Sequence, residues 1–325
     1  MSSLPAFSVT EYQSAKRILA TQVALMMGRK LEEGDWTHVY CNSKGIPDTG
    51  WSNLHIDIAH EGLGVELKML RCAQLKGRPL KSVCGTTLMH PAATRSIRID
   101  DPEREANKVK DDVLYQYAEL INERSLRVAR TGSSGRADMR TGWLIWEDTL
   151  TEFLYFEEPM IAPDPTDFYA EWNITPARGI RKSSKSLWVY EVGTNRKRYS
   201  VTTTAGIKIQ PYFDVPPPSD PNLYYFRVQS EALDADTIRL WILPSTARAL
   251  ESRLGILNKE SLSGAILTNA AALAAAIPAD APDDGLAVPV LISMRAYEVL
   301  VGLWEAVSDE HRAQTLARAL ASLPK

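Results

Sequence analysis

The sequence predicts an α+β (α/β) protein, in which helices flank a mixed central sheet. A β-rich elaboration and a mainly helical C-terminal region follow. Helical periodicity surrounds a short pair of strands before residue 130, alternating apolar residues recur over 142–213, and helix patterns dominate after 245. The proline-rich segment 216–221 is the clearest linker. We therefore expect one domain over 1–215 and a second over 222–325.

The first half of the chain contains two predicted helices. Ser8 and Glu11 form a capping box, in which the two residues satisfy free backbone N–H groups reciprocally. Apolar residues at helical spacing then continue to about Leu31, and segment 36–41 is predicted to be a short strand. A second helix is predicted over 101–128, because Asp-Pro opens it and an apolar stripe follows.

Later segments alternate between strand and helix signals. The turn Gly193-Thr-Asn195 joins two strands as a hairpin, and we interpret the β-rich part as support for target recognition. Ser308 is placed to cap the last helix. The predicted strands cover 142–146, 152–156, 186–191, 198–203 and 207–213, and the predicted C-terminal helices cover 245–254, 265–277, 293–307 and 309–323.

Composition excludes several classes of protein. The chain has 325 residues, of which 45% are hydrophobic and 24% charged, as in an ordinary globular protein with a large core. No apolar stretch is long enough to span a membrane, and no signal peptide or ATP-binding P-loop motif is present. The three cysteines lack zinc spacing, which favours a reducing cytoplasm.

The segment 53–70 carries the strongest functional signal. It is predicted to form two strands around the turn His60-Glu61-Gly62. Side chains two residues apart on a strand share a face, so Glu66 and Lys68 project together, and strand pairing brings Asp57 to Glu66. Two carboxylates and a lysine at one point are the groups that a magnesium-dependent phosphodiester hydrolase needs.

The chemistry assigns a role to each of these groups. Asp57 and Glu66 supply carboxylates to Mg²⁺, for which Mn²⁺ is a substitute, and the metal polarises the phosphate and activates a bound water. Lys68 orients or deprotonates that water, with a pKa that a neighbouring cation and burial are expected to lower. Asp48, in a predicted turn, is the rival first carboxylate. The choice between one metal and two stays open.

Asp57 followed by Glu66-x-Lys68, with an apolar residue before the glutamate, resembles the PD-(D/E)xK nuclease superfamily. Its best-known members are type II restriction endonucleases. The resemblance covers about 20 residues, or about 100 with the surrounding order of helices and sheet. It implies a restriction-endonuclease-like fold and Mg²⁺-dependent hydrolysis of specific duplex DNA sites. An acid on the N-terminal helix sometimes touches the metal in this superfamily, which makes Glu11 and Glu33 weaker candidates.

Basic residues are clustered although the net charge is −3. No acidic residue lies between Lys68 and Asp100, and Glu191 is the one acid within 178–198. Phosphate contacts supply most nucleic-acid affinity, so local clusters matter more than net charge. The predicted DNA-binding residues are Arg71, Lys76, Arg78 and Lys81 in the first cluster, and Arg178, Arg181, Lys182, Lys185, Arg196, Lys197 and Arg198 in the second.

Several alternatives remain open from the sequence. The same fold serves methylation-dependent restriction endonucleases and DNA-repair or recombination nucleases, and a non-catalytic DNA-binding protein is a further reading of the motif. The C-terminal region is interpreted as a winged-helix reader, a dimerisation unit or a helical extension. Its terminal helices carry few basic residues, which favours dimerisation. A homodimer with twofold symmetry matches a palindromic site.

Overall fold

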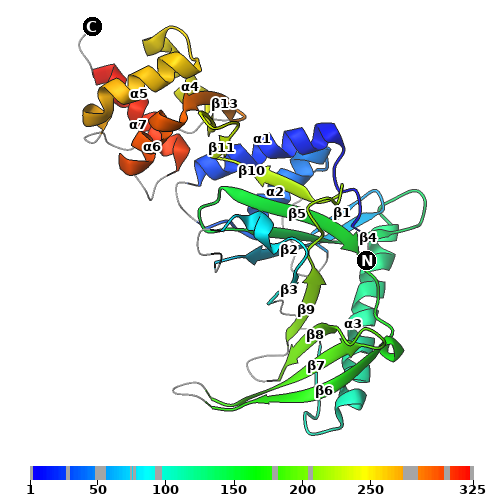
Figure 1. Cartoon of the computed structure of the whole chain (residues 1–325). Helices are drawn as coiled ribbons and strands as arrows, with labels where there is room; N and C mark the ends of the chain where they lie inside the picture. Colours follow the sequence, from blue (N-terminus) through cyan, green and yellow to red (C-terminus); the bar gives the residue numbers. More distant parts are fainter. Residues whose placement is uncertain are drawn as a thin grey trace.

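The computed structural model describes residues 3–26, 30–47, 56–73, 75, 78–91, 97–177, 182–203, 208–273, 285–303 and 308–322. Within these residues the chain builds two five-stranded sheets, one three-stranded sheet and seven α-helices (Figure 1). The predicted mixed α+β class is therefore confirmed. No helix in this part of the chain is both long and apolar enough to cross a membrane.

The first sheet has the strand order β1-β2-β4-β5-β10. Its second and third strands, β2 and β4, run parallel, and all other neighbours are antiparallel. A parallel pair needs a long crossover, and here that crossover contains the helix α3 (Ala106–Ala129). The strands are β1 (Ile58–His60), β2 (Leu63–Arg71), β4 (Asp138–Trp146), β5 (Glu152–Pro159) and β10 (Tyr224–Arg227).

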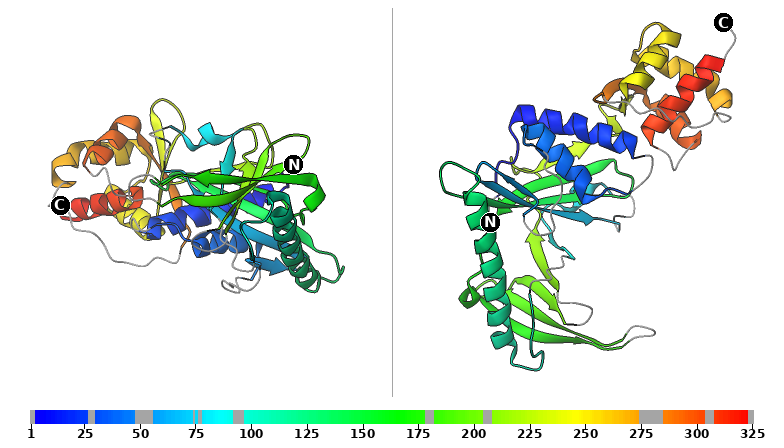
Figure 2. Two further views of the ribbon diagram at one scale, coloured as in Figure 1. Left: turned by 90° about the horizontal axis from the view of Figure 1, so that it is seen from below. Right: turned by 180° about the vertical axis from the view of Figure 1, so that it is seen from behind.

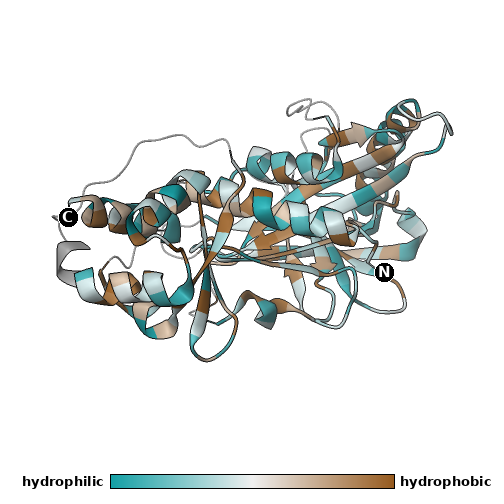
Figure 3. Cartoon of the chain, turned by 90° about the horizontal axis from the view of Figure 1, so that it is seen from above, coloured by the Kyte–Doolittle hydropathy of each residue, from teal (hydrophilic) through white to brown (hydrophobic). Residues whose placement is uncertain are grey.

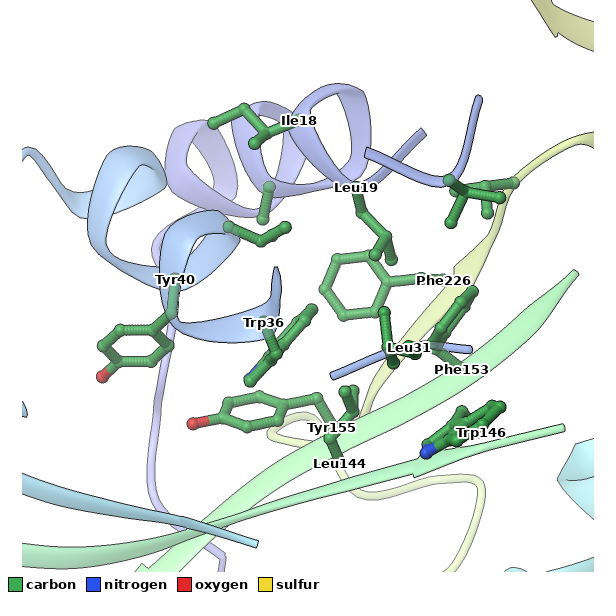
Figure 4. Packing of buried hydrophobic residues seen from close by; sticks show 14 of the residues in the cluster. Ile18, Leu19, Leu31, Trp36, Tyr40, Leu144, Trp146, Phe153, Tyr155 and Phe226 are labelled. Atoms are coloured by element: carbon green, nitrogen blue, oxygen red, sulfur yellow. The ribbon is translucent and has the colours of Figure 1, made fainter. Parts of the chain in front are cut away.

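Two helices, α1 (Val9–Leu25) and α2 (Glu33–Lys44), cover one face of the first sheet. The predicted capping box of α1 is present, although the helix ends before Leu31. The predicted strand over 36–41 is wrong, because these residues lie inside α2. Trp36 and Tyr40 are four residues apart, so they share one face of a helix, and both are buried beside Tyr155 of β5 (Figure 4).

The second sheet has the strand order β3-β9-β8-β7-β6. The helix α3 reaches from the first sheet to this one and packs on β6 and β7 (Figures 1 and 2). The chain between β2 and α3 contains the short helix η1 (Leu80–Val83) and the edge strand β3 (Thr87–Met89), which the sequence did not predict. The remaining strands are β6 (Phe168–Thr175), β7 (Ser184–Glu191), β8 (Lys197–Thr202) and β9 (Lys208–Asp214), with the short helix η2 (Pro165–Asp167) before β6.

The C-terminal part combines helices with a small sheet that the sequence did not predict. Hydrophilic and hydrophobic residues are interspersed along its helices, as Figure 3 shows. Ser308 caps the last helix, since its Oγ accepts from the backbone N–H of His311 at 3.3 Å. The elements are β11 (Ser230–Ala232), β12 (Thr237–Ile242), β13 (Val288–Ser293), α4 (Pro244–Leu254), α5 (Lys259–Leu273), α6 (Met294–Leu303) and α7 (Asp309–Ser322).

The proline-rich segment 216–221 does not separate two domains in the way the sequence suggests. The strand that follows it, β10, pairs with β5 of the first sheet. The segment therefore joins the second sheet to the first. The C-terminal part begins near β11, after the chain has returned to the first sheet.

Candidate functional site

The hairpin of β1 and β2 carries the predicted catalytic residues. Glu61 and Gly62 connect its strands with φ values of +48° and +88°, as in a type I′ turn, which matches the twist of paired strands. The register pairs Ile58 with Val65. Asp57, one residue before β1, therefore comes opposite Glu66, as the sequence predicts for a paired hairpin.

The carboxyl group of Asp57 lies over β2. Its Oδ2 accepts the backbone N–H of Leu67 at 2.7 Å. Burial, together with the negative charge of Glu66, raises the pKa of Asp57 to about 7. The two carboxyl groups are thus close enough to disfavour simultaneous ionisation, which is the arrangement that a bound cation would relieve.

Two cations hold Glu66. The Nζ of Lys68 lies 2.7 Å from its Oε1, and the Nη1 of Arg124 lies 2.9 Å from its Oε2. All three side chains are largely buried, with exposed fractions of 13% for Glu66, 22% for Lys68 and 19% for Arg124. An ion pair with this little exposure is less screened by solvent than a surface pair.

The protonation of Lys68 differs from the expectation. Burial acts to lower the pKa of Lys68, but the carboxylates of Glu66, Asp57 and Glu33 outweigh it and raise that pKa above its ordinary value. The predicted lowering is therefore wrong for this arrangement of charges. The expectation assumed a cation beside the lysine, whereas three acids surround it here.

The further acidic candidates separate into two groups. Glu33, the first residue of α2, lies within reach of the charges of Lys68 and Glu66, and burial raises its pKa. Glu11 instead caps α1 by accepting from the backbone of Ser8, and its Oε1 lies 3.3 Å from Lys44. Asp48 lies outside the described residues.

Arg124 and His90 are site residues that the sequence did not suggest. Arg124 comes from α3, and its Nε is buried without a hydrogen-bond partner among the described residues. His90 follows β3, and its Nε2 lies 2.9 Å from the carbonyl oxygen of Met69. Because a carbonyl only accepts, this nitrogen carries the hydrogen. Burial and the charge of Lys68 lower the pKa of His90 to about 4, so the ring is neutral.

The donor groups at this site fit magnesium by type. In the described part of the chain, no group of three or more His, Cys, Asp or Glu side chains is arranged to hold a metal ion. Mg²⁺ usually takes one or two protein carboxylates and completes its shell with water and phosphate oxygens, so Asp57 and Glu66 suffice. A metal at Glu66 would compete with Lys68 and Arg124 for its oxygens.

The predicted DNA-binding residues are partly neutralised by acids from other strands and loops. Arg71 pairs with Asp148, Lys185 with Glu103, and both Arg196 and Arg198 with Asp214. Lys81 and Lys197 lie over aromatic rings, and Arg78 and Lys182 are exposed. Lys76, Arg178 and Arg181 lie outside the described residues. Clustering along the chain therefore overstated the free positive charge, because the partner acids are distant in sequence.

Comparison with known proteins gives no further guide. The chain has no significant match to any protein-family model, curated protein or solved structure.

Proposed function

We propose that this protein is a Mg²⁺-dependent nuclease of the type II restriction endonuclease kind, acting on phosphodiester bonds in DNA. One observation carries the proposal: the β1–β2 hairpin brings Asp57, Glu66 and Lys68 together at a largely buried point. The resemblance of these residues to the PD-(D/E)xK motif supports it. The parallel pair β2–β4 with α3 in its crossover suits such a fold.

Each side chain has a role in this proposal. Asp57 and Glu66 would hold the metal, which supplies Lewis acidity and a water of lowered pKa when bound. Lys68, held by Glu66, donates hydrogen bonds to the attacking water or to the phosphate oxygens. Arg124 fixes the second oxygen of Glu66 and adds positive charge where the phosphate becomes more negative.

The finer features of the function also belong to the proposal. Duplex DNA with a specific recognition site, a homodimer and a cytoplasmic location are what the resemblance and the composition suggest. Arg78 and Lys182 are exposed, and neither forms an ion pair with an acid among the described residues. These two residues are therefore the candidates for phosphate contacts. The C-terminal part is the candidate for dimerisation.

A non-catalytic DNA-binding protein is the second candidate, and one observation favours it. Both oxygens of Glu66 are already engaged by Lys68 and Arg124, so the motif also functions as a buried ion-pair cluster without any metal. An ion-pair cluster of this kind stabilises the fold and does not require a substrate or a metal. The two candidates differ in whether a divalent cation changes the covalent state of DNA.

Digestion of mixed plasmid and phage DNA tests the proposal. The wild-type protein should cleave with Mg²⁺ and not with EDTA, and Glu66→Ala should abolish cleavage because a carboxylate is lost. Using methylated and unmethylated DNA in parallel shows whether a modified base is required. The proposal fails if the Glu66→Ala protein cleaves as fast as the wild type. Metal-independent DNA binding without cleavage under any divalent ion would instead support the second candidate.

A further inference from the structure

His90 is held firmly at the candidate site, although the proposed reaction gives it no role. It follows β3, and its backbone N–H donates to the carbonyl oxygen of Pro211 at 2.9 Å. Its Nε2 lies 2.9 Å from the carbonyl oxygen of Met69. Its ring lies edge to face with that of Trp143, with centroids 5.7 Å apart and planes at 63°. These three contacts fix the position of the imidazole.

Asp57 and His90 bind backbone groups on the same edge of β2. Asp57 accepts the N–H of Leu67 at 2.7 Å, and His90 donates to the carbonyl of Met69, two residues further on. Backbone groups two residues apart on a strand point to the same side, which here is the side of β1. The pairing with β1 ends before these residues, so side chains take the backbone groups instead. Lys68 lies between the two contacts.

The ring of His90 lies beside the side chain of Lys68. Trp143 is the register partner of Lys68 on β4, so both side chains project from one face of the first sheet. His90 reaches from the edge of β2, at Met69, to the Trp143 ring on that face. Burial and the charge of Lys68 lower the pKa of His90 to about 4, which agrees with this proximity.

The Nδ1 atom of His90 is a hydrogen-bond acceptor without a partner. The Nε2 carries the hydrogen because the Met69 carbonyl only accepts, and the second nitrogen of a neutral imidazole is an acceptor. This Nδ1 is buried and has no hydrogen-bond partner among the described residues. An unsatisfied buried acceptor is destabilising, and such a group in a folded protein commonly marks an ordered water or a ligand.

A water molecule between His90 and Lys68 satisfies both side chains. The ammonium group of Lys68 has three N–H donors, and one of them is directed to Glu66 at 2.7 Å. A water that accepts from Lys68 and donates to Nδ1 of His90 keeps its second lone pair free. Hydrolysis of a phosphodiester needs such a lone pair, held in a fixed direction.

We propose that His90 orients the attacking water by accepting its hydrogen bond at Nδ1, while Lys68 donates to the same water. The inference rests on the proposed function for the attack, but not for the position of the water. In the reaction the water oxygen bonds to phosphorus, and the bond from phosphorus to the leaving ester oxygen breaks. One water proton ends on the leaving oxygen, and the other stays on the new phosphate oxygen until that group ionises.

Nitrogen-15 NMR of histidine-labelled protein in EDTA tests the water position without cleavage. The chain has five histidines, and the signals that disappear in His90→Gln are those of His90. The wild-type protein should show a protonated Nε2 and an unprotonated Nδ1 with the chemical shift of a hydrogen-bonded acceptor. A protonated Nδ1, or one with the chemical shift of a free acceptor, overturns the inference.

The kinetics of His90→Gln test the role of this water. Glutamine keeps an N–H that can donate to the Met69 carbonyl, but it lacks the Nδ1 acceptor. The variant should keep the wild-type melting temperature and KM, and its kcat for plasmid cleavage with Mg²⁺ should fall by about 100-fold. Cleavage at the wild-type rate overturns the inference. A loss of rate that accompanies a loss of stability also overturns it, because it assigns His90 a structural role.

His60→Gln is the matched control. His60 lies in the β1–β2 hairpin with its side chain 35% exposed, and its replacement should leave kcat unchanged. Failure of the nuclease function gives a different result. A hydrogen-bonded Nδ1 in a wild-type protein that cleaves no DNA with Mg²⁺ would overturn that function and support the position of the water.

Discussion

At the scale of single residues, the candidate site is a balance between acids and cations. Asp57, Glu66 and Glu33 raise the pKa of Lys68, while burial and Glu66 raise the pKa of Asp57. Glu66 is held on one side by Lys68 and on the other by Arg124. The motif residues were visible in the sequence, but Arg124 was not, because a helical arginine gives no sign of which strand it meets.

Asp57→Asn should stabilise the protein in EDTA at pH 8, and should stabilise it much less at pH 4.5. The pKa of Asp57 rises from an ordinary 3.8 to about 7 on folding, so the folded state binds this proton more tightly than the unfolded state. The free energy of unfolding of the wild-type protein therefore falls as the pH increases from about 3.8 to about 7. Asparagine cannot ionise, so the variant does not lose this stability. Thermal unfolding at both pH values measures it, and an Asn variant less stable at pH 8 would contradict the assignment.

Arg124→Ala should lower the free energy of unfolding by about 1–3 kcal/mol, because it leaves a largely buried carboxylate with one cation fewer. Arg127→Ala is the control on the same helix. Arg127 pairs with Glu123 at the surface, and such pairs contribute less than about 1 kcal/mol. Urea unfolding compares the two variants, and equal losses would show that Arg124 does not support Glu66.

At the scale of elements, turns and caps were predictable, but the type of a short apolar segment was not. The capping box of α1 and the hairpins around Gly62 and Gly193 are present as predicted. Segment 36–41 was predicted as a strand because a short apolar run fits the two-residue repeat of a strand as well as the repeat of a helix. The strand β3 was missed because its pairing with β9, far along the chain, defines it.

Gly62→Ala should destabilise the hairpin that carries the site by about 1–3 kcal/mol. Gly62 has a φ of +88°, and an added Cβ would lie 2.9 Å from the carbonyl oxygen of Arg136. Gly193→Ala is a matched control, since Gly193 has the same φ of +88° but no atom within 4 Å of the added Cβ. The Gly62 variant should lose more stability in thermal unfolding, and the reverse order would contradict the packing of this turn.

At the scale of the whole molecule, the chain returns to its first sheet before entering the C-terminal part. No local feature of the sequence indicates this return, because the pattern of β10 predicts a strand whichever sheet it joins. Its buried Phe226 packs with Trp36 and Tyr12 in the core under α1 and α2. The sequence therefore predicted the helical character of the C-terminal part, but not where it begins.

A chain ending at residue 229 should be more stable than one ending at 221. The shorter chain lacks β10, which exposes the edge of β5 and removes Phe226 from the core. Losing one large aromatic side chain from a core costs about 3–5 kcal/mol. Circular dichroism melts compare the two truncations, and equal stability would contradict the assignment of β10 to the first sheet.

The proposed function requires Asp57, Glu66 and Lys68 to form one metal-dependent site for phosphodiester hydrolysis. The most direct measurement is the rate of conversion of supercoiled plasmid to nicked or linear DNA with Mg²⁺. Asp57→Asn, Glu66→Gln and Lys68→Ala should each reduce this rate by at least about 100-fold, as expected when a catalytic group is removed. Glu61→Gln should not, because Glu61 lies in the same hairpin with its side chain 82% exposed. Cleavage that survives all three substitutions, or is lost equally with Glu61→Gln, would contradict the claim.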